Sequence, residues 1–352
     1  MSDGARAGAN PLVVGVGGIG CELAAACQVP TTRLRLLDFA TGGLDAYPPE
    51  ATIRLGGEPE DTDDMDPQAM REAAQEAADR LADGVEGAVG LALLLGAVGG
   101  QTGAIVLPVL ANELRDAECT TVVVAVEPLP FEGQARADLA AQALGELEFA
   151  VDLVLAVPNR ALSELCDTAQ PVEQALACLK RKIARSARLL LEALADRSSV
   201  GLQPAELRRS LAEAGRGAVG TGIGRSGKRV EEAIRDACAN SFLTQESCQR
   251  ASAAILHLRG GEDLSLSEVS SATDMVAHLV GQVPVQVGLS TDGEEGEVRA
   301  VLLVTGIQAP QLEGADAETP SAAEHHELSF YDGENLDIPA FIRRQAVGRL
   351  RR

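Results

Sequence analysis

One stretch, Leu91–Pro108, constrains the fold of this chain most, because a glycine cluster separates two apolar runs within it. Its first five residues are apolar without a break, which is typical of a strand buried on both faces of a parallel sheet. Small residues that permit a tight turn follow: Gly96, Gly99, Gly100, Thr102 and Gly103. Backbone N–H groups exposed in such a turn, at the start of a helix, form an anion site suited to phosphate. A tight turn that binds no ligand is the alternative interpretation.

A second glycine cluster lies near the N-terminus. Leu12–Gly15 forms a short apolar strand that leads into Gly15, Gly17 and Gly20, which have GxGxxG spacing. Asp38 ends the next strand-like run, LRLLD, at about the distance expected for an acid that binds a ribose. The pattern predicts a dinucleotide site. A Rossmann-type nucleotide-binding enzyme, similar to those that adenylate ubiquitin-like proteins, is therefore an alternative.

Strand and helix patterns alternate along the first half of the chain. The sequence predicts a helix over Pro67–Ala82, a strand over Thr120–Val126, a helix ending near Leu147 and a strand over Val151–Val157. This alternation is typical of a parallel sheet in an α/β fold. The glycine loop after Leu95 is not part of the dinucleotide pattern. Two phosphate-type loops at the carboxyl ends of neighbouring strands favour a different nucleotide fold.

The charge and length of the chain bound its possible functions. The 352 residues carry a net charge of −22, which excludes nucleic acid as a partner because phosphates would be repelled. Only three of the thirty basic residues are lysines. Acid-rich, lysine-poor surfaces suit a salt-rich cytoplasm, where screening reduces self-repulsion, so we expect the protein of a halophile. The length favours two domains with sizeable cores.

The seven cysteines show no metal-ligand pattern, since there is no CxxC pair and no histidine close to one of them. We therefore expect free, mostly buried thiols in a reducing compartment, and no metal site. No apolar run reaches a membrane-spanning length, and the first residues lack a signal-peptide pattern. These observations predict a cytoplasmic protein with no direct membrane span.

Segments along nearly the whole chain resemble the bacterial and archaeal tubulin relative FtsZ. In the first half they are VVGVGGIG, GAVGGQTGA, PLPFEGQAR and VPN, similar to that family's first glycine loop, its GGGTGTG signature, its PFxFEGxxR segment and its IPN. In the second half they are SGKRVEEAIRDACANSFL and GEVRAVLLVTGI. The tail LDIPAFIRRQA (Leu336–Ala346) is similar to the family's anchoring peptide. The chain is identified as a divergent, archaeal-type member of the tubulin/FtsZ family.

The resemblance implies an α/β fold of the tubulin/FtsZ type, in five parts. They are a Rossmann-like parallel-sheet nucleotide domain (1–170), a long central helix (171–199), a second α/β domain with the activating-type loop (200–308), a disordered linker (309–335) and an anchoring peptide (336–352). The residues agree with this division. Pro171–Asp196 is rich in Ala and Leu, as a largely buried helix would be, whereas Ala309–Leu328 shows no periodicity.

The resemblance also implies a site for GTP or GDP. The residues that would contact the phosphates, through backbone N–H groups and a hydroxyl, are Gly17, Gly18, Gly20, Gly99, Gly100, Thr102 and Gly103. Glu132 would accept a hydrogen bond from the ribose, and Arg136 would lie nearby. Asn159 would contact the sugar or the base.

The residues implied for hydrolysis depart from the family pattern. In FtsZ filaments the NxDxxD loop of one subunit enters the pocket of the next, where its carboxylates polarise the attacking water. Here that loop is Gly201–Glu206, with Gln203 in place of the first acid and Glu206 in place of the second. An amide can orient a water but cannot act as a general base. We therefore expect a degenerate catalytic pair, Gln203 and Glu206, with reduced or absent hydrolysis and weak or absent nucleotide.

The nucleotide loops depart from the pattern as well. Gln101 replaces a glycine where backbone approaches phosphate, and Asp64–Pro67 places carboxylates where the γ-phosphate would lie. The family's guanine-binding Asn-Asp pair corresponds to Lys180 and Arg181. These donors can bond O6 and N7 of guanine but cannot accept from its N–H groups, so we expect poor guanine specificity. Pairing of both cations with surface acids is the alternative.

The predicted function is that of an FtsZ-like cytoskeletal protein of cell division, located in the cytoplasm at the division site. The predicted partners are copies of itself or another FtsZ in head-to-tail filaments, and a membrane-anchor protein that binds Leu336–Ala346. Two other functions stay open. One is a working GTPase that polymerises like FtsZ, and the other is a regulatory partner that caps or joins filaments of another FtsZ.

Overall fold

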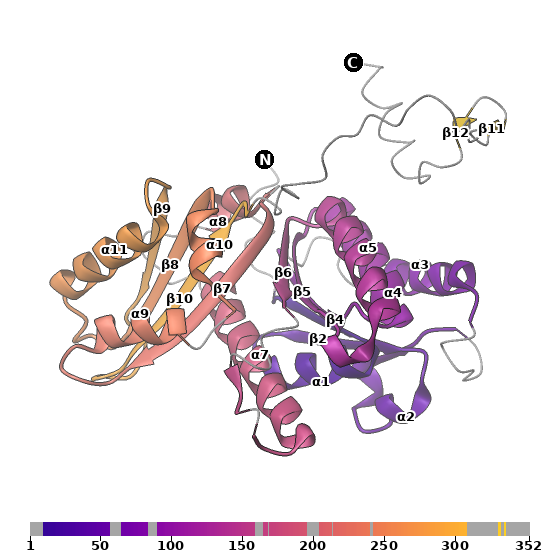
Figure 1. Ribbon diagram of the computed structural model, residues 1–352, viewed down its shortest axis with the longest axis horizontal. Coiled ribbons are helices and arrows are strands. Elements are labelled where there is room, and N and C mark those ends of the chain that lie inside the picture. The colour runs from indigo at the N-terminus through magenta and orange to yellow at the C-terminus, as the bar shows by residue number, and fades with distance from the viewer. Residues whose placement is uncertain are drawn as a thin grey trace. The chain divides into compact units, whose positions relative to one another are not determined.

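Ten strands form one mixed sheet in the order β3-β2-β1-β4-β5-β6-β7-β10-β8-β9 (Figure 1). A computed structural model gives this architecture, and it describes residues 10–56, 65–83, 90–158, 165–167, 169–195, 204–212, 214–239, 242–307, 330–331 and 334–335. Contacts group the chain up to Ala309 into one unit and the remainder into a second. In the second unit β11 (Phe330–Tyr331) pairs antiparallel with β12 (Glu334–Asn335), inside the range predicted as linker.

The first six strands are all parallel to their neighbours, which confirms the predicted parallel α/β sheet. They are β1 (Leu12–Val16), β2 (Arg33–Asp38), β3 (Thr52–Arg54), β4 (Leu91–Ala97), β5 (Thr120–Val126) and β6 (Leu153–Val157). Their order, 3-2-1-4-5-6, is also that of dinucleotide-binding folds. Strand order alone therefore does not separate the FtsZ interpretation from the Rossmann one.

Strand β4 shows why its sequence is apolar without a break. Leu91, Leu93 and Leu95 pack into a core with α1 (Gly17–Cys27) and α7 (Val172–Ala195). Ala92 and Leu94 face the opposite core. That core is built with α3 (Pro67–Asp83), α4 (Gln101–Asp116) and α5 (Gln134–Ala150), which lie together on one face of the sheet (Figure 1). Both faces are covered by helices, so every position of the strand except the last, Ala97, is buried.

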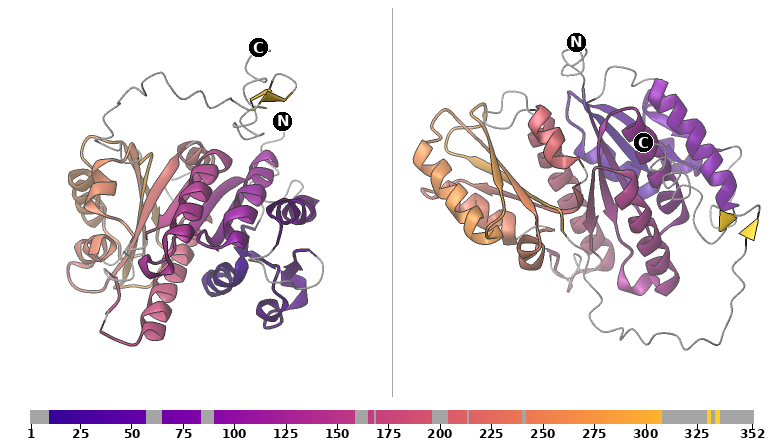
Figure 2. Two further views of the ribbon diagram at one scale, coloured as in Figure 1. Left: turned by 45° about the vertical axis from the view of Figure 1, so that its right-hand side comes forward. Right: turned by 90° about the horizontal axis from the view of Figure 1, so that it is seen from above.

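The long helix α7 matches the predicted helix over Pro171–Asp196 to within one residue at each end. Its buried side chains share one core with Val219, Val301 and Leu303, which lie on strands of the second half. The hydroxyls of Ser186 on α7 and Thr221 on β7 are 3.2 Å apart. Both views of Figure 2 show α7 between the two groups of strands. This helix therefore packs against both halves of the sheet.

The second half continues the same sheet with antiparallel pairs. Its strands are β7 (Gly215–Gly224), β8 (Ala253–Gly260), β9 (Val285–Ser290) and β10 (Val298–Thr305), and its helices are α8 (Pro204–Leu211), α9 (Arg229–Ala239), α10 (Gln245–Gln249) and α11 (Leu266–Val280). β10 lies antiparallel between β7 and β8, whereas β8 and β9 are parallel. The helices α9 and α11 cover the face opposite α7.

Strand β7 was not predicted as a strand, because glycine is depleted in strands. Its alternate glycines have a packing role. A Cβ at Gly220, Gly222 or Gly224 would lie 2.4 Å from Ala237 O, 2.0 Å from Ala233 O and 1.7 Å from Arg229 O, respectively. The backbone of α9 therefore lies directly on the backbone of β7, and no larger residue fits between them.

Candidate nucleotide site

A cavity of about 730 Å³ lies where β1, β4, β5 and β6 end. The last residues of these strands, or those directly after them, are Val16, Ala97, Val126 and Val157, and all four line it. The carboxyl ends of parallel strands are where α/β sheets bind their ligands. Both glycine loops, the segment before α5 and one side of α7 complete the wall.

The two glycine loops open into the first turns of two helices. Helix α1 starts at Gly17 and α4 starts at Gln101, and neither start has a side-chain cap. Gly17 has φ +71°, a left-handed conformation that favours glycine. The first N–H groups of a helix have no partner within it and carry the positive end of its dipole. Two helix N-termini therefore face one cavity, an arrangement suited to the phosphates of a nucleotide.

The predicted phosphate-contacting glycines fall into two groups. At Gly18 and Gly100 an added Cβ would meet nothing within 4 Å, so both face open space on the wall of the cavity. At Gly103 and Gly99 a Cβ would lie 1.9 Å from Ala97 O and 2.7 Å from Pro128 Cβ. These two also line the cavity, but close packing, against the backbone of Ala97 for Gly103 and against the Pro128 ring for Gly99, already favours glycine there.

Gly20 differs from the other predicted glycines because it is not among the described residues that line the cavity. A Cβ on it would lie 2.3 Å from Leu95 O, so it brings α1 close to β4. Thr102 lies on the wall, as does Gln101. Ala104 and Ile105 stand at the last two positions of the GGGTGTG signature, and both are buried in the core beneath α4. Substitution there changes the core and not the wall.

Glu132 and Arg136 lie together at the mouth of the cavity. Glu132 Oε1 accepts a hydrogen bond from the backbone N–H of Leu129 at 2.8 Å. Its Oε2 accepts from Arg136 Nη1, also at 2.8 Å, one turn further along the chain. An ionised carboxylate offers about four lone-pair sites, so Glu132 can still accept from a ribose hydroxyl. The sequence predicted the proximity of Glu132 to Arg136 from the resemblance alone.

The two residues predicted to meet the base are placed differently. Lys180 lies on the wall of the cavity, and its Nζ is 2.5 Å from Glu22 Oε2 on α1. Arg181 is exposed and is not among the described lining residues. Within the described wall both cations, Lys180 and Arg136, are thus paired with carboxylates. Phosphates in this cavity would be bound mainly by backbone N–H groups.

Asp38 is a wall residue that the sequence assigned only to the dinucleotide pattern. It ends β2, lines the cavity and is 6% exposed. Its Oδ1 accepts the backbone N–H of Phe39 at 2.8 Å and that of Ala40 at 3.5 Å. Burial raises the pKa of this carboxyl above its ordinary value, although the two N–H groups oppose the shift. The wall of a cavity suited to an anion thus includes a buried acid, and burial makes this acid harder to ionise than an exposed aspartate.

The remaining predicted residues lie away from the cavity or outside the described part of the chain. Glu206 is exposed in the first turn of α8 and is not among the described lining residues. Asn159, Gln203 and Asp64 are outside the described residues. None of the described cysteines, histidines or acids groups into a metal site. Among the described helices, none is both long and apolar enough to cross a bilayer.

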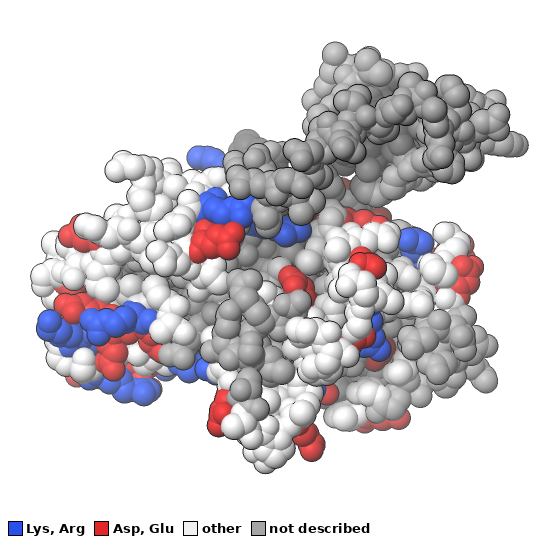
Figure 3. All heavy atoms as spheres, viewed as in Figure 1, with Lys and Arg blue, Asp and Glu red and all other residues white. Residues whose placement is uncertain are grey.

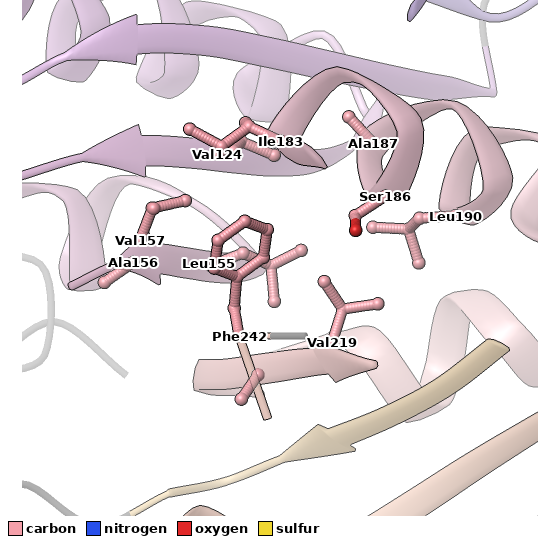
Figure 4. Close-up of a pocket in the computed structure, with 11 residues that line it drawn as sticks. Val124, Leu155, Ala156, Val157, Ile183, Ser186, Ala187, Leu190, Val219 and Phe242 are labelled. Carbon is pink, nitrogen blue, oxygen red and sulfur yellow. The ribbon is translucent and has the colours of Figure 1, made fainter. Parts of the chain in front are cut away.

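A second gap lies between β5, β6, α7 and β7, but it is too small for a ligand. Figure 4 shows Phe242, Ser186 and Leu155 closing it from three sides. Its accessible space is about 10 Å³, which is at the lower limit for one water molecule. The larger cavity has a volume typical of small-molecule sites, and its donors suit an anion. The described residues therefore fit a nucleotide held through its phosphates.

These features define a nucleotide-binding α/β protein, and family models identify it further. Residues 62–167 match the GTPase domain of the tubulin/FtsZ family, and residues 215–308 match the C-terminal domain of the FtsZ family. Together the two matches cover more than half of the chain. The chain belongs to the tubulin/FtsZ family, as the sequence segments predicted.

Curated relatives agree with this assignment. "Cell division protein FtsZ" of Haloferax mediterranei is 27% identical over 260 residues, which cover 73% of this chain and 68% of that protein. The FtsZ of Pseudomonas aeruginosa is 26% identical, with 80% of this chain and 74% of that protein covered. FtsZ 1 of Rhizobium meliloti is 28% identical over 87% of this chain, but the chain spans only 53% of it.

Solved structures show the same fold. An empty FtsZ dimer from M. jannaschii superposes with a TM-score of 0.74 at 24% identity, covering 85% of this chain and 89% of that one. CetZ2 from Haloferax volcanii, solved as a GTPγS-bound protofilament, superposes with a TM-score of 0.69 at 21% identity, covering 85% and 93%. These structures confirm the predicted tubulin/FtsZ fold. The family models and the curated relatives confirm the predicted FtsZ/tubulin-like cytoskeletal protein of cell division.

Proposed function

We propose that this protein is an FtsZ-like filament subunit of cell division that binds guanine nucleotide weakly and hydrolyses GTP slowly or not at all. The observation that carries the proposal is the cavity lined by both glycine loops, with Gly18 and Gly100 open to it. Two uncapped helix starts at this cavity support phosphate binding through backbone N–H groups. As in its relatives, the proposed location is the cytoplasm at the division site.

Slow hydrolysis follows from the residues proposed to meet the γ-phosphate. GTP, when bound, supplies a phosphoanhydride bond that water can cleave. The chain's own contribution is a water-orienting group from the next subunit, which we assign to Gln203 and Glu206. Glu206 is exposed at the start of α8, where a neighbouring copy can contact it. Gln203 offers an amide in place of a carboxylate, so it cannot act as a general base, and Glu206 is left as the single acid of the pair.

Weak binding follows from the charges on the wall. Asp38 and Glu132 bring negative charge to a site for polyphosphate, while Lys180 and Arg136 are already paired with Glu22 and Glu132. Like charges in a partly enclosed site repel a nucleotide unless a cation intervenes. Lys180 is a donor only, so it cannot accept from N1–H or N2 of guanine. We therefore propose low affinity and low selectivity for guanine over other bases.

Phosphate release from GTP in molar KCl tests the hydrolysis part. We expect the rate to be near background, and Gln203→Asp to raise it, because losing a positioned general base commonly costs roughly a hundred- to ten-thousand-fold. The double variant Gln203→Asp/Glu206→Gln is the matched control and should lose most of that gain. Turnover of the unmodified protein at ordinary FtsZ rates would contradict the proposal and favour the working GTPase.

Assembly is tested separately. A head-to-tail contact between the Gly201–Glu206 loop and the glycine loops of the next subunit does not close on itself, so it yields filaments. Pelleting and light scattering at high salt, alone and mixed with another FtsZ, should detect polymer in at least one case. A strict monomer under both conditions would overturn this part. Polymer only in the mixture would identify a co-assembling partner.

The proposed membrane link is the tail Leu336–Ala346, which lies outside the described residues. Its apolar positions Ile338, Phe341 and Ile342 have the i, i+3, i+4 spacing of one helix face. So short a segment forms a stable helix only against a partner's groove. Removing residues 336–352 should leave assembly intact and abolish recruitment to the division site. Unchanged localisation of the truncated protein would exclude the tail as the link.

A further inference from the structure

Two of the seven cysteines lie next to each other beside the nucleotide cavity. Cys166 follows β6, and Cys178 lies in the first half of α7. Their Sγ atoms are 2.8 Å apart, although the two residues are separated by twelve positions in the chain. Both are free thiols. A sulfur–sulfur distance this short needs only a small movement to become a covalent bond.

Cys178, like Cys238, is more exposed than the other five cysteines. Burial raises the pKa of Cys21, Cys27 and Cys248 to about 12, and each is buried in a core. Cys178 is only partly buried, so a small reagent can reach it. Thiol reactivity requires such access.

Cys166 is the buried member of the pair, at 8% exposed. Burial and the neighbouring Cys178 raise its pKa to about 11, while the charges of Lys182 and Arg181 act in the opposite direction. These two cations also attract an anionic reagent. The pair thus combines a partly exposed thiol, a second thiol in contact with it and two neighbouring cations. In this arrangement one thiol can attack a small disulfide and the other can resolve the mixed disulfide.

We infer that Cys166 and Cys178 form a modification site, which a low-molecular-weight anionic disulfide oxidises to an intramolecular disulfide. The Cys178 thiolate attacks one sulfur of the small disulfide and releases one small thiol. The Cys166 thiolate then attacks the Cys178 sulfur and releases the second small thiol. Two protein thiols lose two electrons, the small disulfide gains them, and the two protons leave on the released thiols.

Neither cysteine is among the described lining residues of the cavity, but the bond would link α7, which lines it, to the chain that follows β6. Val157 and Pro158, at the end of β6, line the cavity on one side. Leu176, Leu179 and Lys180 on α7 line it on another, directly beside Cys178. Oxidation would therefore tie the chain after β6 to the first half of α7. A cross-link of this kind restricts opening of the segment that it closes.

Oxidation of the full chain with glutathione disulfide, which carries several carboxylates, tests the chemistry. After treatment in molar KCl and alkylation of the remaining thiols, digestion should give one linked peptide pair, Cys166 with Cys178, that reducing agent removes. The variant Cys238→Ser/Cys248→Ser should give the same pair. In Cys166→Ser, Cys178 should instead keep one glutathione, because the resolving thiol is missing. Full alkylation of both cysteines, or glutathione on each without a link, would overturn the inference.

Hydrogen exchange gives a second readout that needs no nucleotide. Amide exchange over residues 172–180 should slow several-fold on oxidation and recover on reduction. Exchange in α9, far along the chain from the pair, should not change, and Cys178→Ser should abolish the effect. Equal exchange of α7 in the reduced and oxidised protein would show that the bond leaves the cavity wall unchanged and would contradict that part.

Discussion

The two halves of the sheet differ in what accompanies their close backbone packing, which is a cavity in the first half and a buried arginine cluster in the second. Both halves contain close backbone contacts at glycines, since a Cβ at Gly103 would lie 1.9 Å from Ala97 O and one at Gly224 would lie 1.7 Å from Arg229 O. In the nucleotide half, glycines of the same loops also line a cavity. In the second half, a buried arginine links several elements through its side chain. Arg229, at the start of α9, has a side chain that is 10% exposed and bonds both Asp263 and Glu268. Gly18 and Gly100 leave room for a ligand on the cavity wall, whereas the ion pairs of Arg229 connect packed elements.

Arg229, Asp263 and Glu268 form an arginine cluster in which the guanidinium donates several short hydrogen bonds. Arg229 Nε and Nη2 donate to the two oxygens of Glu268 at 2.8 Å and 3.1 Å, and Nη2 also donates to the backbone oxygen of Asp263 at 2.9 Å. These bonds hold the pKa of Glu268 well below its ordinary value, at about 2. Figure 3 shows acidic and basic side chains next to one another at the end of the molecule formed by the second half.

The ion pairs at the cavity are more exposed than the pairs of Arg229. Lys180 and Arg136 are 39% and 52% exposed, and each has one carboxylate partner. Exposed pairs of this kind contribute little to stability, commonly below about 1 kcal/mol. Their partners can be exchanged when a ligand enters. The comparison therefore predicts that mutations in the second half change stability, whereas mutations on the open side of the glycine loops change binding.

The largest effect is expected at Gly103, a glycine of the nucleotide half that packs directly against backbone. Gly103→Ala places a Cβ against Ala97 O, so α4 must move away from β4, and we expect about 3 kcal/mol of destabilisation or loss of folding. Gly18→Ala is the matched control, since its Cβ meets nothing, and its stability should change by less than about 0.5 kcal/mol. Urea unfolding at high salt measures both. Equal stability of the two variants would contradict the distinction between Gly103, which packs against backbone, and Gly18, which faces open space.

The second effect concerns Arg229. Arg229→Met keeps most of the apolar contact but removes bonds to two carboxylates, and we expect a loss of about 2 kcal/mol in unfolding free energy. Arg235→Met is the control, because Arg235 is 72% exposed and its contact with Glu231 is 3.5 Å. That variant should stay within about 0.5 kcal/mol of the unmodified protein. A smaller loss for Arg229→Met than for Arg235→Met would contradict the comparison.

The arginine cluster also predicts a pH dependence. The folded pKa of Glu268 is below its ordinary value of 4.5, so its contribution to stability is fully present above pH 4.5. It is lost as the pH falls from there towards about 2, because the carboxyl becomes protonated in the folded state. Unfolding curves of the unmodified protein and of Glu268→Gln should therefore converge over this range. Parallel curves would show that Glu268 is not the titrating group.

The sequence predicted the elements whose patterns are local. The strand over Thr120–Val126 has the predicted ends, and α7 was placed to within one residue at each end, because their apolar positions repeat with the period of their structure. Strand β7 was missed, since its glycines have meaning only against the backbone of α9. Local patterns predict an element, but they do not show what packs on it.

The candidate site shows the same difference between local patterns and tertiary contacts. The positions of both glycine loops followed from the sequence, but not which glycines face the ligand, because that depends on the distance to a neighbouring strand. The pairing of Lys180 with Glu22 joins residues 158 positions apart. The contact of Cys166 with Cys178 depends on the path of the chain between β6 and α7. Such contacts arise only from tertiary structure.

A smaller effect, on binding alone, is expected at Gly18. Its missing Cβ leaves space on the wall of the cavity beside the start of α1. Gly18→Ala would fill part of the space proposed for phosphate, and we expect roughly tenfold weaker binding of GDP, equivalent to about 1.4 kcal/mol. Gly145→Ala, on α5 with equally open surroundings but away from the cavity, is the control. Calorimetric titration at high salt should show a change only for Gly18→Ala.

The smallest effect, and of opposite sign, is expected at Asp38. Its buried carboxylate adds negative charge to the wall, so Asp38→Asn should strengthen GDP binding a few-fold at neutral pH while keeping an oxygen to accept from Phe39 and Ala40 N–H. Because burial raises the pKa of Asp38, the carboxyl becomes protonated at a higher pH than an exposed aspartate would. Affinity of the unmodified protein should therefore rise as the pH falls towards that pKa, and the advantage of Asp38→Asn should disappear there. Titrations of both proteins across that range measure the difference, and an advantage that is constant with pH would show that charge at Asp38 does not control binding.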